Sequence, residues 1–483
     1  MIPKRPYRFA IAAALVAVAA CAINPVTGER QLALISEEQE IALGRDSAQQ
    51  IMETLSPVDD EDLQQYVQAI GQRLAMDSER PELPWSFQAV DDPQPNAFAL
   101  PGGFILVTRG LLGLMSSEAE LAAVLGHEIG HVTARHSVVQ LSRAQLAQLG
   151  LGLGIVLSPE LAQFGDLAGA GLNLLFLSYG RADERQADEL GFRYMLDQGY
   201  AVSEMENVFV SLARSGELAG QSPLPTWLAS HPSEPERIEA VRERIAALPA
   251  PQTDGRVGRE PYLETIDGLV YGHDPRAGYF DGGMFYHPEL AFQMAVPEEW
   301  RRQNLTNMVA AVSEQSDAAL QLTLTQAASA EDAARRFASQ QNVAVAGSSR
   351  ERLNGNAAVV SRFRAAADGV GTVAGYVAHI EHGGRVYQLV AYAAESRFEG
   401  YARGLEGLIG SFAPLRDPDR LGVEAARIEV VQLDRAISFA DFVRRYPSSV
   451  REEELLVLNG ITDPDAEIPA GTRLKRVVGG TRS

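Results

Sequence analysis

The amino-acid sequence predicts an α+β protein whose mainly helical first domain contains a small β-hairpin or sheet. A second α+β module and a small C-terminal unit are expected to follow. Three observations predict this organisation. The chain has 483 residues, which suits roughly three domains of about 150 residues each. Helix-start signals dominate its first half, and strand-like alternation follows a stretch rich in Pro and Gly. The composition, 46% hydrophobic and 22% charged, is that of a folded globular protein.

Helix-start and turn signals place the elements of the first domain. Ser36 with Gln39, and Ser117 with Glu120, are capping boxes that begin helices. The Pro101–Gly103 turn separates two apolar runs and predicts a tight hairpin. The expected elements are helices at about 37–55, 60–76, 118–140, 182–197, 202–216 and 234–247, a strand at 85–90, and hairpin strands at 96–100 and 104–107.

Residues 144–178 are rich in Leu, Gly and Ala and are interrupted at Ser158-Pro159. Each apolar half has about a dozen residues, fewer than the roughly 20 that span a bilayer. We therefore expect a buried or lid-like helical hairpin. A surface that dips into lipid is the alternative.

A Pro- and Gly-rich stretch at 248–260 is predicted to be a linker. Beyond it, residues 261–415 are expected to form the second module and residues 426–477 the third unit. Strands of the second module are expected at about 320–324, 357–363, 372–381 and 385–392, and a helix at about 397–411.

Charge and cysteine content exclude several classes of protein. Lys and Arg number 42, and Asp and Glu number 63, so the formal net charge is -21. A surface this negative repels phosphate backbones, so nucleic acid is not expected as a partner. The single cysteine excludes an internal disulfide and a thiolate metal cluster.

The first 21 residues have the three parts of a bacterial export signal. A basic start precedes an apolar run of about 12 residues, fewer than the roughly 20 that span a bilayer. The Val18–Cys21 end of this run resembles a lipobox. Residues 1–20 are therefore predicted to be a signal peptide, and Cys21 to be a lipid-carrying N-terminus that anchors the protein. Because Ala22 follows the cysteine, the resemblance favours the periplasmic face of the outer membrane.

The run His127-Glu128-Ile129-Gly130-His131 matches an H-E-x-x-H motif inside the helix expected at 118–140. Residues four apart lie on one helix face, so both imidazoles can bind one ion. Zinc suits two neutral imidazoles and a carboxylate, with a water in the open position. The ion lowers the pKa of that water to about 7, and Glu128 can take its proton. The alternative is a pair of hydrogen-bonded helix histidines without metal. His136, five residues past His131, is expected off the ligand face as a structural residue.

A third ligand has to come from elsewhere in the chain. A metzincin would place it six residues after His131, but Ser137 stands there, and Ala134 replaces the expected Gly. Glu184 offers a carboxylate on a later helix, and Asp188 lies four residues on, on the same face. Asp188 can accept a hydrogen bond from a ligand imidazole. Such a pair usually belongs to a solvated face, but beside an H-E-x-x-H motif it is the best candidate for a site that holds one zinc ion.

Three motifs, taken in order, resemble one known family. The runs Pro95–Gly103 and Leu125–Val132, followed by Glu184-x-x-Ala187-Asp188, resemble the HtpX/BepA group of gluzincin zinc metalloendopeptidases, peptidase family M48. The run Cys21–Gly28 resembles its exported lipoprotein members, and the resemblance covers about residues 21–247. It implies that His127, His131 and Glu184 bind zinc, that Glu128 is the catalytic base, that Asp188 supports a zinc ligand, and that Asn96, Ala97, Phe98 and Ala99 form a substrate-binding edge strand.

His231 and Arg237 fit a further pattern of the BepA-like members. The resemblance implies that His231 is a self-inhibitory fourth zinc ligand and that Arg237 lies near the active site. Such a histidine could occupy the position of the water until a substrate or partner displaces it. The alternative is that His231-Pro232 only starts a helix capped by Ser233 and Glu236.

The C-terminal half departs from the family, because no helical tetratricopeptide tail follows the first domain. Residues 261–415 faintly resemble a PsbP/Mog-like α+β module, and residues 428–476 resemble a degraded LysM unit. A LysM-like unit would imply contact with cell-wall peptidoglycan. A docking module or a plain structural cap is the alternative.

The leading hypothesis is a lipid-anchored, zinc-dependent endopeptidase that cleaves unfolded or misassembled envelope proteins. A second hypothesis is a self-inhibited periplasmic chaperone or wall-bound adaptor, whose site His231 blocks permanently. A zinc-dependent peptidoglycan hydrolase is the third, and it draws only on the LysM-like unit.

Overall fold

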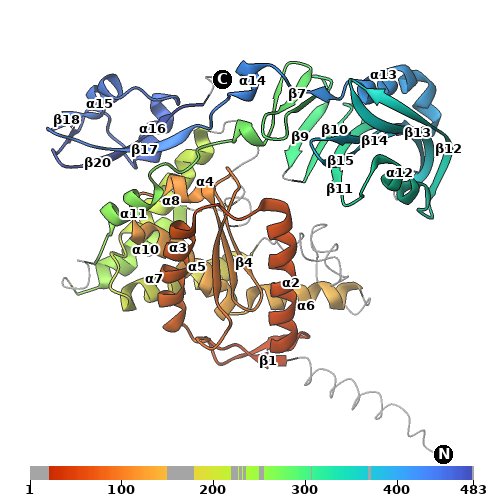
Figure 1. Ribbon diagram of the computed structural model, residues 1–483. Coiled ribbons are helices and arrows are strands. Elements are labelled where there is room, and N and C mark those ends of the chain that lie inside the picture. The colour runs from red at the N-terminus through yellow and green to blue at the C-terminus, as the bar shows by residue number, and fades with distance from the viewer. Residues whose placement is uncertain are drawn as a thin grey trace, which may run out of the picture. The chain divides into compact units, whose positions relative to one another are not determined.

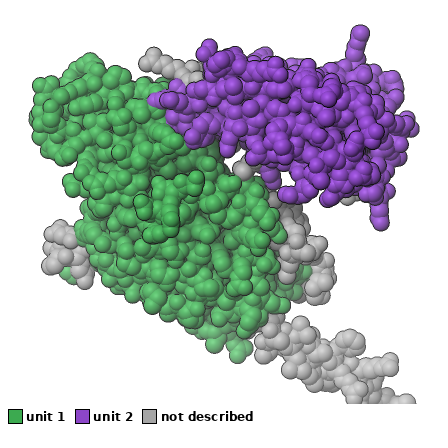
Figure 2. Space-filling view, in the orientation of Figure 1, with its two compact units in different colours: residues 1–272, 427–478 green, residues 273–426, 479–483 purple. Residues whose placement is uncertain are grey.

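Two groups of residues, each with its own hydrophobic core, make up this computed structural model. Unit 1 comprises residues 1–272 and 427–478, and unit 2 comprises residues 273–426 and 479–483 (Figure 2). Both units mix helices and sheets, which confirms the expected α+β class. The structure describes residues 21–148, 179–218, 227, 231, 235–249, 255–305, 307–367 and 371–480.

A three-stranded sheet forms the β part of unit 1. Strand β5 (Phe104–Thr108) lies in the middle, parallel to β3 (Ser86–Val90) and antiparallel to β4 (Ala97–Leu100). The hairpin turn needs glycine at Gly102, where φ is +78° and an added Cβ would come within 2.6 Å of the Ile41 Cα atom. Helix α3 packs against β3, and α2 packs against β4 and β5 (Figure 1).

The other elements of unit 1 surround this sheet. They are β1 (Cys21–Ile23), β2 (Arg30–Leu32), α2 (Glu37–Leu55), α3 (Glu61–Met76), α4 (Arg109–Leu114), α5 (Glu118–Thr133), α6 (His136–Gln148), α7 (Arg181–Asp197), α8 (Glu204–Leu218), α10 (Pro235–Ala247) and α11 (Arg259–Ile266). Helix α11 therefore begins inside the stretch predicted to be a linker. Residues 1–20, and residues 149–178 of the predicted hairpin, lie outside the described residues. No helix in the described ranges is long and apolar enough to cross a membrane.

Helix α5 is buried along its whole length and packs closely against α7. Glycines make the close approach possible. A Cβ atom added to Gly191 would lie 2.8 Å from the His127 backbone nitrogen, and one added to Gly130 would lie 3.0 Å from the Ala187 Cα atom. The two backbones therefore touch, and side chains from both helices can reach a common point.

The single helix expected at 118–140 is wrong, because the chain breaks between α5 and α6. Arg135 adopts a left-handed φ of 60° there, which costs free energy for a residue with a side chain. Tertiary contacts hold this turn. The Arg135 Nε–H group donates to Glu40 Oε2 at 2.9 Å, and the Asn24 amide donates to the Ala134 carbonyl oxygen at 3.4 Å. Both partners lie far from the break in sequence.

The last part of the chain returns to unit 1. Ile428 and Val457 are buried in the core that also contains α3, α5 and α8. The LysM-like assignment of these residues stays a prediction. Their elements are β17 (Arg427–Gln432), β18 (Ile437–Ser438), α15 (Phe439–Arg445), α16 (Glu452–Leu458), β19 (Glu467–Ile468) and β20 (Arg473–Val478), with β17 antiparallel to β20 and β18 to β19.

Lys475 ties this returning segment to the centre of unit 1. Its side chain is fully buried, and its Nζ atom donates to the carbonyl oxygens of Gly113, Leu114 and Met115 at 3.0, 3.1 and 2.6 Å. These carbonyls end helix α4, where no further helical turn supplies donors. Burial lowers the pKa of Lys475, and the nearby charge of Glu120 opposes that effect.

Unit 2 contains a seven-stranded antiparallel sheet in the order β12-β13-β14-β15-β11-β10-β9 and a four-stranded sheet in the order β16-β8-β7-β6. Helix α12 covers one face of the larger sheet, and α13 packs on the opposite face with the smaller sheet. The strands are β6 (Tyr279–Asp281), β7 (Met284–His287), β8 (Phe292–Ala295), β9 (Arg301–Leu305), β10 (Met308–Val312), β11 (Ala318–Thr325), β12 (Val343–Leu353), β13 (Asn356–Ala367), β14 (Gly371–His382), β15 (Arg385–Ala394) and β16 (Ala413–Pro414), and the helices α12 (Ala330–Ala338), α13 (Phe398–Gly410) and α14 (Pro418–Leu421).

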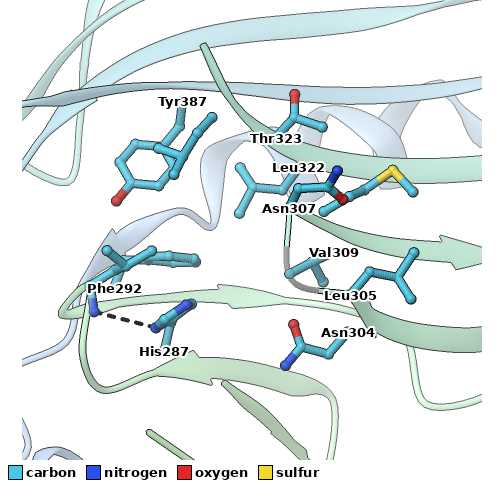
Figure 3. A pocket seen from close by; sticks show the side chains of 12 residues that line it. His287, Phe292, Asn304, Leu305, Asn307, Val309, Leu322, Thr323 and Tyr387 are labelled. Atoms are coloured by element: carbon cyan, nitrogen blue, oxygen red, sulfur yellow. Dashed lines mark hydrogen bonds between the residues drawn. The ribbon is translucent and has the colours of Figure 1, made fainter. Parts of the chain in front are cut away.

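A pocket opens in unit 2 between strands of its two sheets (Figure 3). Its wall is largely apolar, with Leu322 and Val309 on one side and Phe292 on another. Burial, together with the charge of Arg385, lowers the pKa of His287 in this wall to about 4. Within the described part of unit 2, no three metal-ligating side chains converge, so this pocket is not the candidate metal site.

We predict that Lys475→Met destabilises unit 1 although it preserves side-chain bulk. The substitution leaves three buried carbonyl oxygens without their donor, which should cost about 3 kcal/mol of unfolding free energy. Thermal and urea denaturation measure the loss. Arg435→Met, at an exposed position of the same segment, is the matched control and should unfold like the wild type. Equal stability of the two variants would contradict the assignment.

Candidate metal centre

Four buried side chains in unit 1 bring their ligand atoms within 4.8 Å of one another. His127 and His131 come from successive turns of α5, and Glu184 comes from the first turn of α7. His231 is the fourth, and its backbone N–H group donates to the Trp227 carbonyl oxygen at 2.8 Å. The contact between α5 and α7 thus joins residues more than fifty positions apart in sequence.

The distances between these donor atoms suit one metal ion. The Nε2 atoms of His127 and His131 are 3.0 Å apart, and each lies 3.5 Å from an oxygen of Glu184. Ligands at zinc distances of 2.0–2.2 Å in a tetrahedron are themselves about 3.3 Å apart. Imidazole nitrogens and a carboxylate are also the donors that zinc prefers. The residues present therefore fit a zinc ion.

The protonation states of these groups follow from burial and charge. Burial raises the pKa of Glu184, but the charge of His231 and hydrogen bonds from the three histidines lower it far more, so the carboxylate is ionised. Burial also lowers the pKa of His131 well below its ordinary value. Burial alone would lower the pKa of His127, but Asp188 and Glu184 raise it to about 9.

Asp188 and Arg237 lie directly behind the cluster. The His127 Nδ1–H group donates to Asp188 Oδ1 at 2.9 Å, which leaves Nε2 directed at the metal position. Arg237 donates from Nε and Nη2 to the two oxygens of Asp188, both at 2.7 Å, and its Nη1 lies 3.1 Å from Glu184 Oε2. One buried guanidinium therefore faces two buried carboxylates.

Glu128 lies beside the cluster and is fully buried. Its Oε1 atom is 3.5 Å from the His231 Nε2 atom. Burial raises the pKa of Glu128, and the charges of His231 and His127 partly offset that rise. A carboxylate with a raised pKa can both accept and release a proton near neutral pH.

The predicted edge strand and the predicted lipidation residue lie elsewhere in unit 1. Strand β4 packs against α5 and is an end strand of its sheet, paired with β5 alone in the part of the chain that the structure describes. Asn96, Ala97 and Phe98 are buried, whereas Ala99 is half-buried. Cys21 begins β1, opposite Leu32 of β2.

Three residues next to the cluster were missed from the sequence. The Tyr179 ring stacks on the His131 ring at 3.9 Å, and the Trp227 ring lies 5.0 Å from the His231 ring. His136, expected to be merely structural, places Nδ1 at 2.9 Å from the Nδ1 atom of His131. The spacing of Trp227, four residues before His231, was an available signal, but the other two positions depend on turns that the sequence does not announce.

Comparison with known proteins follows from this geometry. The model of peptidase family M48 matches residues 61–245, which contain both motifs of the cluster. Residues 61–245 are an M48 peptidase domain. The resemblance stated above is thereby confirmed for this part of the chain.

Curated relatives match the region of the M48 domain. The beta-barrel assembly-enhancing protease of Yersinia pestis is 30% identical over 229 residues, which cover 46% of each chain. The Escherichia coli protein of the same name is 26% identical, again over 46% of each chain. The mitochondrial metalloendopeptidase OMA1 of Schizosaccharomyces pombe is 30% identical over 37% of this chain and 52% of its own. The chain thus spans about half the length of these relatives.

Among solved structures, cyanobacterial PsbP from Synechocystis matches 27% of this chain and 91% of its own, with 13% identity and a TM-score of 0.24. A score of this size assigns no fold. The PsbP/Mog-like assignment of residues 261–415 stays a prediction.

We predict that zinc-free protein loses stability as the pH rises from about 6.5 to 9. Because the folded-state pKa of His127 is raised to about 9, its stabilisation is complete below its ordinary pKa of about 6.5 and is lost through pH 9. The loss should be on the order of a few kcal/mol. Urea denaturation in chelator across this range measures it, and His127→Gln should flatten the slope. An unchanged slope in that variant would contradict the assignment.

Proposed function

We propose that this protein is a zinc-dependent endopeptidase that cleaves unfolded or misassembled polypeptides of the bacterial cell envelope. The observation that carries the proposal is the buried set of His127, His131 and Glu184, with Glu128 beside it, inside an M48 peptidase domain. The names of the bacterial relatives connect related proteases with β-barrel assembly. That connection supports the proposed substrate class.

The side chains divide the work of peptide hydrolysis. Zinc, held by His127, His131 and Glu184, would supply a Lewis acid that polarises a water and the peptide carbonyl. Glu128 would take the proton of the attacking water and deliver it to the leaving amine. Asp188 would orient His127, and Arg237 would compensate the two carboxylates that it faces. The edge strand Asn96–Ala99 would bind an extended substrate by main-chain hydrogen bonds.

His231 would act as the resting inhibitor of this site. Its Nδ1 atom lies 2.9 Å from Glu184 Oε1 and 3.3 Å from His127 Nε2, and its Nε2 atom faces Glu128. The imidazole therefore fills the space between the ligand carboxylate and the base, where water and substrate would have to enter. Substrate or a partner would have to displace it before cleavage.

The address and the remaining modules belong to the same proposal. Cys21 would carry lipid and hold the protein at the periplasmic face of the outer membrane. Residues 426–477 would contact peptidoglycan, and residues 261–415 would form a separate PsbP/Mog-like module. Labelling with a fatty-acid analogue, compared between wild type and Cys21→Ser, tests the anchor.

We predict that Glu128→Gln retains zinc but cleaves casein at least about 100-fold more slowly, because only the proton-transferring group is lost. Metal analysis and a fluorescent casein assay on purified mature protein measure the two properties. Glu204→Gln, an acidic-to-amide change at the start of α8, is the control and should retain full activity. Undiminished cleavage by Glu128→Gln would refute the mechanism.

We predict that His231→Ala cleaves casein several-fold faster than wild type, because its side chain no longer fills the site. Zinc should remain, since three ligands persist. His273→Ala, at an exposed histidine of unit 2, controls for loss of a histidine and should match wild type. If zinc binds but neither wild type nor His231→Ala cleaves any polypeptide, the alternative of a chaperone or adaptor is supported instead.

A further inference from the structure

His136 occupies a distinctive position behind the metal ligands. It is buried and begins helix α6, directly after the left-handed residue Arg135. In one continuous helix, a residue five positions after His131 would lie about 140° around the axis from it. The break at Arg135 changes this direction and brings the two imidazoles to a distance of 2.9 Å between their Nδ1 atoms.

A chain of hydrogen bonds runs outward from His131 through this contact. On its far side, the His136 Nε2 atom lies 3.0 Å from Gln186 Oε1. The Asp183 carboxylate also faces that nitrogen, at 3.8 Å. Both Gln186 and Asp183 come from α7, the helix that carries Glu184. Oxygen atoms thus surround the outer nitrogen of His136.

The order of donors and acceptors along this chain follows from these contacts. Oxygen atoms only accept, so the His136 Nε2 atom carries a proton and donates it to Gln186 Oε1. The Nδ1 atom of a neutral His136 is then an acceptor, and the proton between the two rings belongs to the Nδ1 atom of His131. The Nε2 atom of His131 is left with a free lone pair, and this atom faces His127 and Glu184.

We infer that His136 and Gln186 are positioning residues that hold His131 in its metal-binding tautomer. The inference rests on the proposed zinc site and extends it. Asp188 does the same for His127 with a carboxylate, whereas His131 is served by a neutral imidazole and an amide. Because this pair is uncharged, the cluster already facing Glu184, Asp188 and Glu128 gains no further negative charge.

Zinc affinity of the full mature chain, measured by competition with a chromophoric chelator, tests the inference. Loss of a group that orients a metal ligand typically costs 10–100-fold in affinity. We expect losses in this range for His136→Ala and for Gln186→Met, which keeps the bulk of glutamine but removes its acceptor. Gln186→Glu supplies an acceptor and should bind zinc at least as tightly as wild type. His136→Gln should restore part of the affinity, since its amide oxygen can accept the His131 proton.

Controls separate positioning from packing. His379→Ala removes a buried histidine from unit 2 and should leave zinc affinity unchanged. Gln186 is only half-buried, so both of its variants should melt like wild type in the zinc-free form. Wild-type affinity in both His136→Ala and Gln186→Met would overturn the inference, as would equal losses in Gln186→Met and Gln186→Glu. Failure of wild type to bind zinc would instead refute the proposed function itself.

Discussion

The contact between the backbones of α5 and α7 is the constraint on which the metal centre depends. Gly130 and Gly191 allow the two helices to touch, since a Cβ atom at either position would press against the opposite backbone. Two imidazoles from one helix and a carboxylate from the other can then meet. A wider separation would leave Glu184 beyond the reach of any ion bound by His127 and His131, so these glycines are as necessary to the site as its ligands.

Buried charge is the second constraint. Glu128, Glu184 and Asp188 bring three carboxyl groups into a region from which water is largely removed, and isolated buried charges are strongly unfavourable. Arg237 faces two of them and lies over the Phe209 ring at 4.6 Å. The raised pKa of His127 reflects the same imbalance, because the carboxylates favour a positive charge nearby. A divalent cation would balance this excess of negative charge.

Much of unit 1 was predictable because its signals are local. The capping box at Ser36 placed α2 correctly, and the four-residue spacing of His127 and His131 placed both rings on one face. The break at Arg135 was not predictable, because its left-handed turn depends on Glu40, nearly one hundred residues earlier. The contact of His136 with His131 depends on that break and was missed for the same reason. The edge strands of unit 2 are largely exposed and lack a clear alternation, which explains why several were not foreseen.

The return of residues 427–478 to unit 1 affects the order in which the chain can fold. Lys475 meets carbonyls about 360 positions earlier in the chain, so the ribosome must finish nearly the whole polypeptide before these bonds form. Unit 2, lying between the two parts, consists of consecutive residues apart from a few at the chain end, and can fold while synthesis continues. The protease core is therefore completed last, and a nascent chain crossing a membrane would remain incompletely assembled until its C-terminal segment has emerged.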